Sequence, residues 1–295
     1  MSIAIENIIR KHQENLHPVV PFDAKKQKLA PIDLTANNTE LTAAVFNDTA
    51  LFSEYIDQKR KAAKAAYLIG GYNELRAVYG RSELFDAAPS KSPPVGETFS
   101  ERLMRKDAIS SMSSANKKAI KAVANLDRET IQLFDNEVAQ VSPTGGDLEG
   151  AARRLHLGTD IWGPVSTPVF APLGGMIHSF AFNDNYGDYG ATLILTHQLD
   201  GFPFYTLYGH LSLRDIEHLS AGHYVNRGQK IAHFGEPHEN GHWPPHLHFQ
   251  VILDMELYEG DYPGVCRYSE REKYLANCPD PDVVLRMNRW TTTEI

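Results

Sequence analysis

The stretch HWPPHLHFQV, residues 242–251, places three histidines within seven positions and ends in a run of alternating polar and apolar residues. Successive side chains of a β-strand point to opposite faces. One face of the predicted strand therefore carries His246, His248 and Gln250, while the residues between them are apolar. The apolar face can pack on a core, whereas the histidine face needs water, hydrogen-bond partners or a metal ion.

Two imidazoles at positions i and i+2 of a strand lie about 6.5–7 Å apart at the backbone. Both His246 and His248 could bind the same ion. Alternatively, one could bind the ion while the other acts on whatever the ion holds.

The sequence around this stretch has the texture of a β-sheet. From about residue 152 onward, short segments rich in β-branched and aromatic residues are divided by Gly, Asn and Pro. They follow one another too closely for crossover helices, so we expect antiparallel pairing. The pattern predicts an antiparallel sandwich or barrel-like sheet, followed by a short helix at SEREKYLANC (269–278).

Helices are predicted in the rest of the chain, which makes the fold class α+β. Residues 1–15 show apolar positions at helical spacing, and residues 37–71 look helical up to the stop at Gly70-Gly71. Residues 87–150 combine Pro- and Ser-rich loops with helical composition and predict an inserted element. We therefore expect an N-terminal part (1–86), an insert (87–150) and a β domain with a tail (151–295).

The composition excludes several function classes. A net charge of −8 disfavours nucleic acid and anionic membrane surfaces as partners. The sequence contains no run of about 18 apolar residues, the pattern that predicts a membrane span. The N-terminus shows no secretory signal, so we expect a cytoplasmic protein. Cys266 and Cys278 do not form a CxxC pair and are expected to be reduced residues in a core.

Further metal ligands are offered by the segment RLHLGTDIW (154–162), where His156 and Asp160 are four positions apart. Gly158 between them permits a turn that could bring both side chains to one point. Together with His248 they would form a two-histidine, one-carboxylate zinc site with an open fourth position. His210 and His246 would lie near the metal without binding it, where an imidazole can handle protons.

These motifs, in this order, resemble the lysostaphin-like, LytM-type zinc endopeptidases. The resemblance covers about residues 153–254 and is carried by these segments: HLGTD (156–160), YGHLS (208–212), GHYVNRGQKIAHFG (222–235) and PHLHF (245–249). It implies a duplicated hybrid motif fold, a groove over the metal, zinc ligands at His156, Asp160 and His248, and catalytic histidines at His210 and His246. Residues of the 222–235 segment match the family's structural turn, namely Gly222, Val225, Gly228 and Gln229.

The loop EPHENGHWPPHLHF (236–249) departs from the family pattern, which usually runs through Gly and Thr there. It adds His238 and His242, and its bulky HWPP is expected to reshape one wall of the groove. The N-terminal third could also lie across the groove and offer Tyr72 or Asn73 to the zinc. A packing role for that region is the alternative.

The predicted chemistry is hydrolysis assisted by zinc, which lowers the pKa of bound water to about 7 and polarises a carbonyl. The segment HENGH (238–242) has the letters HExxH but lies in the loop before the histidine strand rather than on a predicted helix, so we expect His210 or His246 to accept the proton. We expect a zinc metallopeptidase acting on small Gly- or Ala-containing peptides, such as peptidoglycan fragments. The alternatives are a non-catalytic regulatory or binding module with this fold and a zinc hydrolase or lyase of small metabolites.

Overall fold

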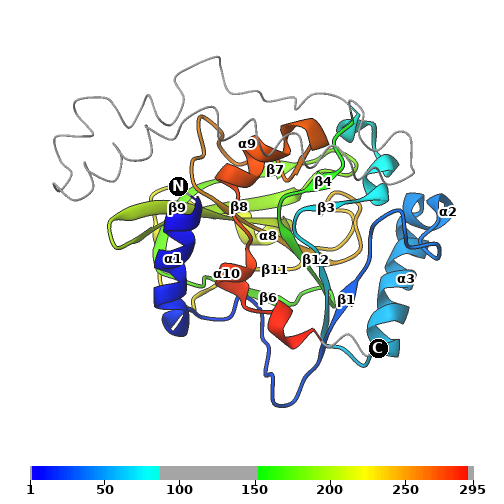
Figure 1. Ribbon diagram of the computed structural model, residues 1–295, viewed down its shortest axis with the longest axis horizontal. Coiled ribbons are helices and arrows are strands. Elements are labelled where there is room, and N and C mark those ends of the chain that lie inside the picture. The colour runs from blue at the N-terminus through cyan, green and yellow to red at the C-terminus, as the bar shows by residue number, and fades with distance from the viewer. Residues whose placement is uncertain (1, 87–151, 292–295) are drawn as a thin grey trace, which may run out of the picture. The chain divides into compact units, whose positions relative to one another are not determined.

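An open eight-stranded sheet dominates the part of the protein that the computed structural model describes, residues 2–86 and 152–291 (Figure 1). The described strands are β1 (Leu29–Ile32), β2 (Tyr67–Gly70), β3 (Glu74–Leu75), β4 (Leu155–His156), β5 (Thr159–Trp162), β6 (Pro168–Phe170), β7 (Gly175–Asn183), β8 (Gly190–Leu199), β9 (Phe202–Leu211), β10 (Tyr224–Val225), β11 (Lys230–His233), β12 (His246–Ile252) and β13 (Val265–Cys266). The described α-helices are α1 (Ser2–His12), α2 (Ala43–Asn47), α3 (Thr49–Ala62), α8 (Leu213–Ile216), α9 (Arg271–Asn277) and α10 (Asp282–Leu285).

The large sheet has the strand order β1-β2-β5-β12-β9-β8-β7-β10, and the remaining strands form two small sheets, β11-β6 and β13-β4-β3. All of these neighbours pair antiparallel except β1 and β2, which are parallel. The prediction of an α+β fold with mainly antiparallel strands is thus confirmed. The barrel-like form is not found, because the described sheet is open, with β1 and β10 at its edges. The sandwich and the hybrid motif stay predictions, and the predicted insert (87–150) lies outside the described residues.

The alternation predicted for the histidine strand is confirmed in β12, which lies between β5 and β9 inside the large sheet. Its apolar face contributes Leu247, Phe249 and Val251 to the largest core cluster, and all three are fully buried. The opposite face, with His246 and His248, is also buried. The histidines are therefore held by packing and hydrogen bonds rather than solvated at a surface.

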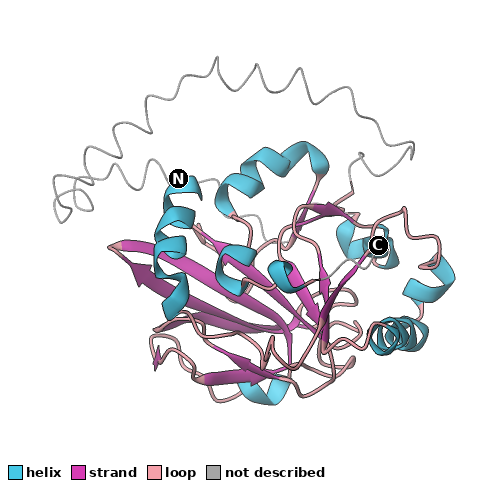
Figure 2. Cartoon of the chain, turned by 60° about the horizontal axis from the view of Figure 1, so that its bottom comes forward, coloured by secondary structure: helices cyan, strands magenta, loops and turns pink. Residues whose placement is uncertain are grey.

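Helices from the N-terminal part pack at opposite sides of the sheet, α1 at one end and α3 at the other (Figures 1 and 2). The predicted amphipathic helix is α1, which adds buried Ile5 and Ile9 to the core cluster of β12. Helix α3 adds Phe52 and Ile56 to a second cluster that contains Trp162 of β5. Both helices therefore belong to the same folded unit as the histidine strands.

The predicted helix over residues 37–71 is wrong at its C-terminal end. Helix α3 begins after Asp48, whose carboxylate accepts hydrogen bonds from the backbone N–H groups of Ala50 and Leu51, and Lys64 beyond its end adopts a left-handed φ of 49°. The following YLIG segment is strand β2, buried at all four residues and paired with β1 and β5. A short apolar run buried on both faces suits a central strand better than a helix end.

Three smaller predictions can be compared with the described residues. The helix predicted at 269–278 is α9. Cys266 and Cys278 are free and buried, as expected. Within the described ranges, no helix has the length and apolar character needed to cross a membrane.

Candidate metal centre

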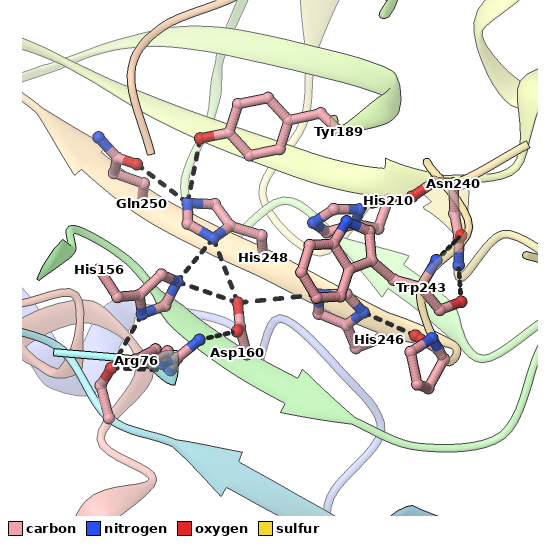
Figure 3. A network of polar contacts seen from close by, with 12 residues as sticks. Arg76, His156, Asp160, Tyr189, His210, Asn240, Trp243, His246, His248 and Gln250 are labelled. Carbon is pink, nitrogen blue, oxygen red and sulfur yellow. Dashed lines mark hydrogen bonds and ion pairs between the residues drawn. The ribbon is translucent and has the colours of Figure 1, made fainter. Parts of the chain in front are cut away.

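Three side chains from β4, β5 and β12 converge on one point (Figure 3). The antiparallel register places His248 directly opposite Asp160. His248 Nδ1 lies 3.2 Å from Asp160 Oδ1, His156 Nε2 lies 3.3 Å from the same oxygen, and the two histidine nitrogens are 2.9 Å apart. His156 and His248, which are 92 positions apart in the sequence, thus each present a ring nitrogen. These two nitrogens and Asp160 Oδ1 form a small triangle.

The outer nitrogens of both histidines are engaged by acceptors, and this determines what the inner nitrogens offer. His156 Nδ1 donates to the carbonyl of Gly71 at 2.9 Å, and His248 Nε2 donates to Gln250 Oε1 at 2.9 Å. A neutral imidazole carries one N–H, so His156 Nε2 and His248 Nδ1 turn lone pairs toward the Asp160 carboxylate. Three converging acceptors repel one another unless a cation lies between them.

Burial favours the neutral form of His156. It lowers the pKa of His156 to about 4, so the imidazole is neutral near pH 7. Burial alone would raise the pKa of the Asp160 carboxyl, but the charge of the Arg76 guanidinium, which donates to Oδ2, holds it well below its usual range. The cluster therefore offers the neutral imidazole of His156, the inner Nδ1 of His248 and one carboxylate.

The geometry fits zinc. Ligand atoms at 2.0–2.2 Å from a tetrahedral ion lie about 3.3–3.6 Å from one another, and the three inner atoms are separated by only slightly less. Two imidazoles and one carboxylate are a donor set that zinc accepts, with hydrogen-bonded outer nitrogens that orient the rings. His156, Asp160 and His248 could thus hold a metal ion.

Gly158, between the two predicted ligands, is needed for a different reason than the sequence suggested. It lacks the positive φ that favours glycine in a turn. Instead, a Cβ built there would lie 2.5 Å from the Cε1 and Nε2 atoms of His248. Glycine is required because the His248 ring lies directly against this backbone.

Replacing Gly158 with alanine is expected to displace His248 and weaken metal binding by at least about 10-fold, since shells that orient ligands contribute about 10–100-fold. The metal Kd, measured by competition with a chelating dye, checks this. Gly80→Ala is the matched control, because a Cβ at Gly80 meets nothing within 4 Å. An unchanged Kd for Gly158→Ala would argue against His248 as a ligand.

His210 reaches the same region through a β-bulge in β9. The β8–β9 register passes from Leu193↔Tyr208 to Ala191↔Leu211, so two residues of β9 oppose one residue of β8. His210 itself has a left-handed φ of 63°. Bulges of this kind re-aim a side chain, and residues with a strained backbone cluster at active sites.

The imidazoles of His210 and His246 are arranged alike. His210 Nδ1 donates to the carbonyl of Asn240 at 2.8 Å, and His246 Nδ1 donates to that of Pro244 at 2.7 Å. Their rings stack with centroids 4.1 Å apart, and His246 Nε2 lies 4.0 Å from Asp160 Oδ1. Burial lowers the pKa of His246 to about 4 and that of His210 well below its usual range. Both are neutral imidazoles whose Nε2 atoms carry lone pairs.

Two adjoining pockets lead to these histidines. The inner one, of about 20 Å³, is lined by Asp160, His210, His246 and His248 and has room for about one water molecule. The outer one, of about 70 Å³, also touches His210 and His248. Tyr79 and Trp243 line both pockets, with ring centroids 6.0 Å apart. The HWPP loop thus contributes an aromatic wall, as its bulk suggested.

The sequence assigned no supporting role to two residues that hold the site together, Gln250 and Arg76. Gln250 orients His248, and its place on the histidine face was the one available signal. Arg76, which contacts Asp160, belongs to no motif.

Tyr72 was a candidate to reach the metal, but its hydroxyl donates to the carbonyl of Cys278. The extra His238 is exposed and lies 3.5 Å from Glu236.

The part of the chain that holds these side chains matches a known protein family. Residues 154–258 match the family described as Peptidase family M23. This confirms the resemblance to lysostaphin-like, LytM-type metallopeptidases, and it places the resemblance in a segment that holds all five predicted site residues. No curated protein matches the chain significantly.

Several solved structures are similar to parts of the chain. A zinc containing peptidase from Vibrio cholerae is 32% identical over 33% of this chain and 27% of that chain, with a TM-score of 0.27. The catalytic domain of the antimicrobial peptidase lysostaphin from Staphylococcus simulans is 24% identical over 49% of this chain and 85% of that one, with a TM-score of 0.33. A putative peptidase M23 from Pseudomonas aeruginosa is 20% identical, covering 44% and 43%, with a TM-score of 0.29.

Proposed function

We propose that the protein is a zinc-dependent metallopeptidase that hydrolyses peptide bonds in small Gly- or Ala-containing peptides of the kind found in peptidoglycan. The observation that carries the proposal is the convergence of three lone-pair donors at His156, Asp160 and His248, with two further neutral imidazoles beside them. The match of residues 154–258 to a peptidase family supports the same reaction class.

His156 Nε2, Asp160 Oδ1 and His248 Nδ1 would hold the zinc ion. When bound, zinc supplies Lewis acidity to a water molecule and to the substrate carbonyl. The chain itself supplies the orientation of the ligands through the Gly71 carbonyl and Gln250. The nearly complete burial of the ligands keeps bulk water from competing with the substrate.

His210 and His246 would manage the protons. The carbonyls of Asn240 and Pro244 hold the proton of each imidazole on Nδ1, so each Nε2 is free to act as a base. One Nε2 would take the proton of the attacking water, and the resulting N–H would return it to the leaving amine. General-base help of this kind contributes about 10²–10⁴-fold to the rate.

The aromatic pair Tyr79 and Trp243 would limit what reaches these histidines. Because both rings line the inner and the outer pocket, they would border the passage by which a substrate approaches Asp160. Residues with hydrogen or methyl side chains fit such a passage better than bulky ones. This supports Gly- or Ala-containing peptides as substrates.

Removing the metal is expected to abolish hydrolysis. The purified protein should contain about one zinc ion per chain, and chelation should reduce the cleavage of oligoglycine, oligoalanine and peptidoglycan fragments to background. Zinc should restore activity and magnesium should not, because magnesium prefers oxygen ligands. Metal content by mass spectrometry and product release by chromatography are the measurements.

Two outcomes would contradict the proposal. A protein that takes up no zinc would favour a non-catalytic binding module. A loaded protein that cleaves small amides of metabolites but none of the peptides would favour the hydrolase of small metabolites.

A further inference from the structure

Arg76 is the most deeply buried cation near the candidate metal centre. Its side chain is 1% exposed and lies just after β3, well outside the segment that matches the peptidase family. A guanidinium in such a position must be paired, since an unpaired buried charge costs several kcal/mol. The hydrogen-bond partners of Arg76 therefore indicate which side chains it positions.

The hydrogen bonds of Arg76 connect it to two of the three candidate ligands, to Asp160 directly and to His156 through a shared acceptor. Nη1 donates to Asp160 Oδ2 at 2.5 Å, and Nη2 donates to the carbonyl of Gly71 at 2.9 Å. That same carbonyl accepts the Nδ1 proton of His156. One side chain thus contacts a candidate ligand directly and shares the hydrogen-bond acceptor that orients a second (Figure 3).

The two oxygens of Asp160 have separate partners as a result. Oδ1 faces His156 Nε2 at 3.3 Å and His248 Nδ1 at 3.2 Å. Oδ2 is engaged by Arg76. A carboxylate held by one oxygen in a charged hydrogen bond cannot rotate to offer both oxygens to an ion without breaking that bond.

Glu74 makes the arrangement compatible with a cation nearby. Its Oε2 accepts from Arg76 Nε at 2.7 Å, so the guanidinium lies between two carboxylates. The two carboxylates and the one guanidinium sum to a single negative charge, the same as Asp160 would bring alone. Arg76 can therefore orient Asp160 without adding net positive charge beside the metal.

We propose that Arg76 is a positioning residue that restricts Asp160 to binding the metal through Oδ1 alone and leaves a coordination position open for substrate. The proposal rests on the proposed function, because it assumes that the cluster binds zinc. It also gives the N-terminal part of the chain a role in the site.

Substitution of Arg76 tests the proposal with cobalt(II) as a spectroscopic replacement for zinc. Arg76→Met removes the charge and the donors while keeping bulk, and Arg76→Lys keeps the charge but cannot hold both carboxylates in the same planar geometry. With Asp160 free to bind through both oxygens, we expect weaker visible absorption, typical of a higher coordination number. The zinc Kd should rise about 10–100-fold.

Arg10→Met is the matched control, since it makes the same change at an exposed arginine of α1 that pairs with Glu6. Its cobalt spectrum and zinc Kd should equal those of the wild type. If Arg76→Met fails to fold by circular dichroism, Arg76→Lys and an X-ray absorption spectrum of the wild-type zinc protein still decide the point. That spectrum should fit one oxygen of a carboxylate rather than two.

The possible failures are distinguishable. A wild-type protein that binds neither zinc nor cobalt would overturn the proposed function, and this inference with it. A wild type that binds metal, with Arg76 variants of the same Kd and spectrum, would overturn the inference alone. Two carboxylate oxygens on zinc in the wild type would also overturn it.

Discussion

Replacing His210 with alanine is expected to reduce kcat by about 10²–10⁴-fold, the usual contribution of a general base or acid, while zinc stays bound. His210 is not one of the three converging ligands, and its ring centroid is 6.3 Å from that of His248. His210 lines the inner pocket, and the Asn240 carbonyl engages its Nδ1, so we expect its loss to remove proton transfer rather than metal binding. Steady-state kinetics and metal content on the same sample are the measurements.

The strained backbone at this position calls for a second variant. With a φ of 63°, residue 210 favours residues that tolerate the left-handed region, such as asparagine. His210→Asn should therefore fold at least as well as His210→Ala and be just as inactive. His238→Ala is the matched control, because that histidine is exposed and should leave kcat unchanged.

Either of two results would contradict the role of His210. Near wild-type kcat in both variants would show that proton transfer does not depend on this imidazole. Loss of zinc from folded His210→Asn would show that the residue supports the metal instead. An equal loss in the control would point to damage of the whole loop 236–242.

The convergence of the histidines could be predicted because it follows from local rules. Side-chain alternation alone placed His246, His248 and Gln250 on one face of β12. The antiparallel pairing of neighbouring strands then brought Asp160 opposite His248. The spacing of these residues carried the resemblance to a metallopeptidase, which the family match supports over residues 154–258.

The support around the cluster could not be predicted, because it depends on contacts that no local pattern records. Arg76 lies 84 positions before Asp160 and reads as one more charged residue in a short segment. The YLIG strand was mistaken for a helix end because its apolar run is too short to show a period. Since β2 pairs with β5, the pairing of the N-terminal part with the large sheet could not be predicted either.

Deleting residues 1–65 is expected to unfold the protein rather than to uncover the groove and activate the enzyme. The deletion removes β1, the parallel partner of β2, and both helices that pack at opposite sides of the sheet. It also removes core side chains of two clusters, among them Ile9 and Phe52, each with no exposed surface. Circular dichroism, urea unfolding and size-exclusion chromatography of the truncated chain are the measurements.

The free energy of unfolding that the deletion removes decides whether the truncated chain unfolds or becomes more active. Burying one large apolar side chain contributes about 1.5–3 kcal/mol, and the net stability of a domain is only about 5–15 kcal/mol. The deleted segment supplies several buried side chains besides Ile9 and Phe52, including Ile5, Leu29 and Ile56. Their combined contribution reaches the whole net stability, so no cooperative unfolding transition should remain.

A pair of point variants in α3 tests the same argument without deletion. Phe52→Ala should cost about 3–5 kcal/mol, because Phe52 packs against Trp162 and Trp243 with ring centroids 5.9 and 6.4 Å away. Leu51→Ala is the matched control, since Leu51 is 47% exposed on the same helix. A truncated chain that folds and cleaves peptides faster than the full chain would show that the N-terminal part is a removable cover. Because Trp243 lines both pockets, Phe52→Ala should also raise KM, which a helix without influence on the site would leave unchanged.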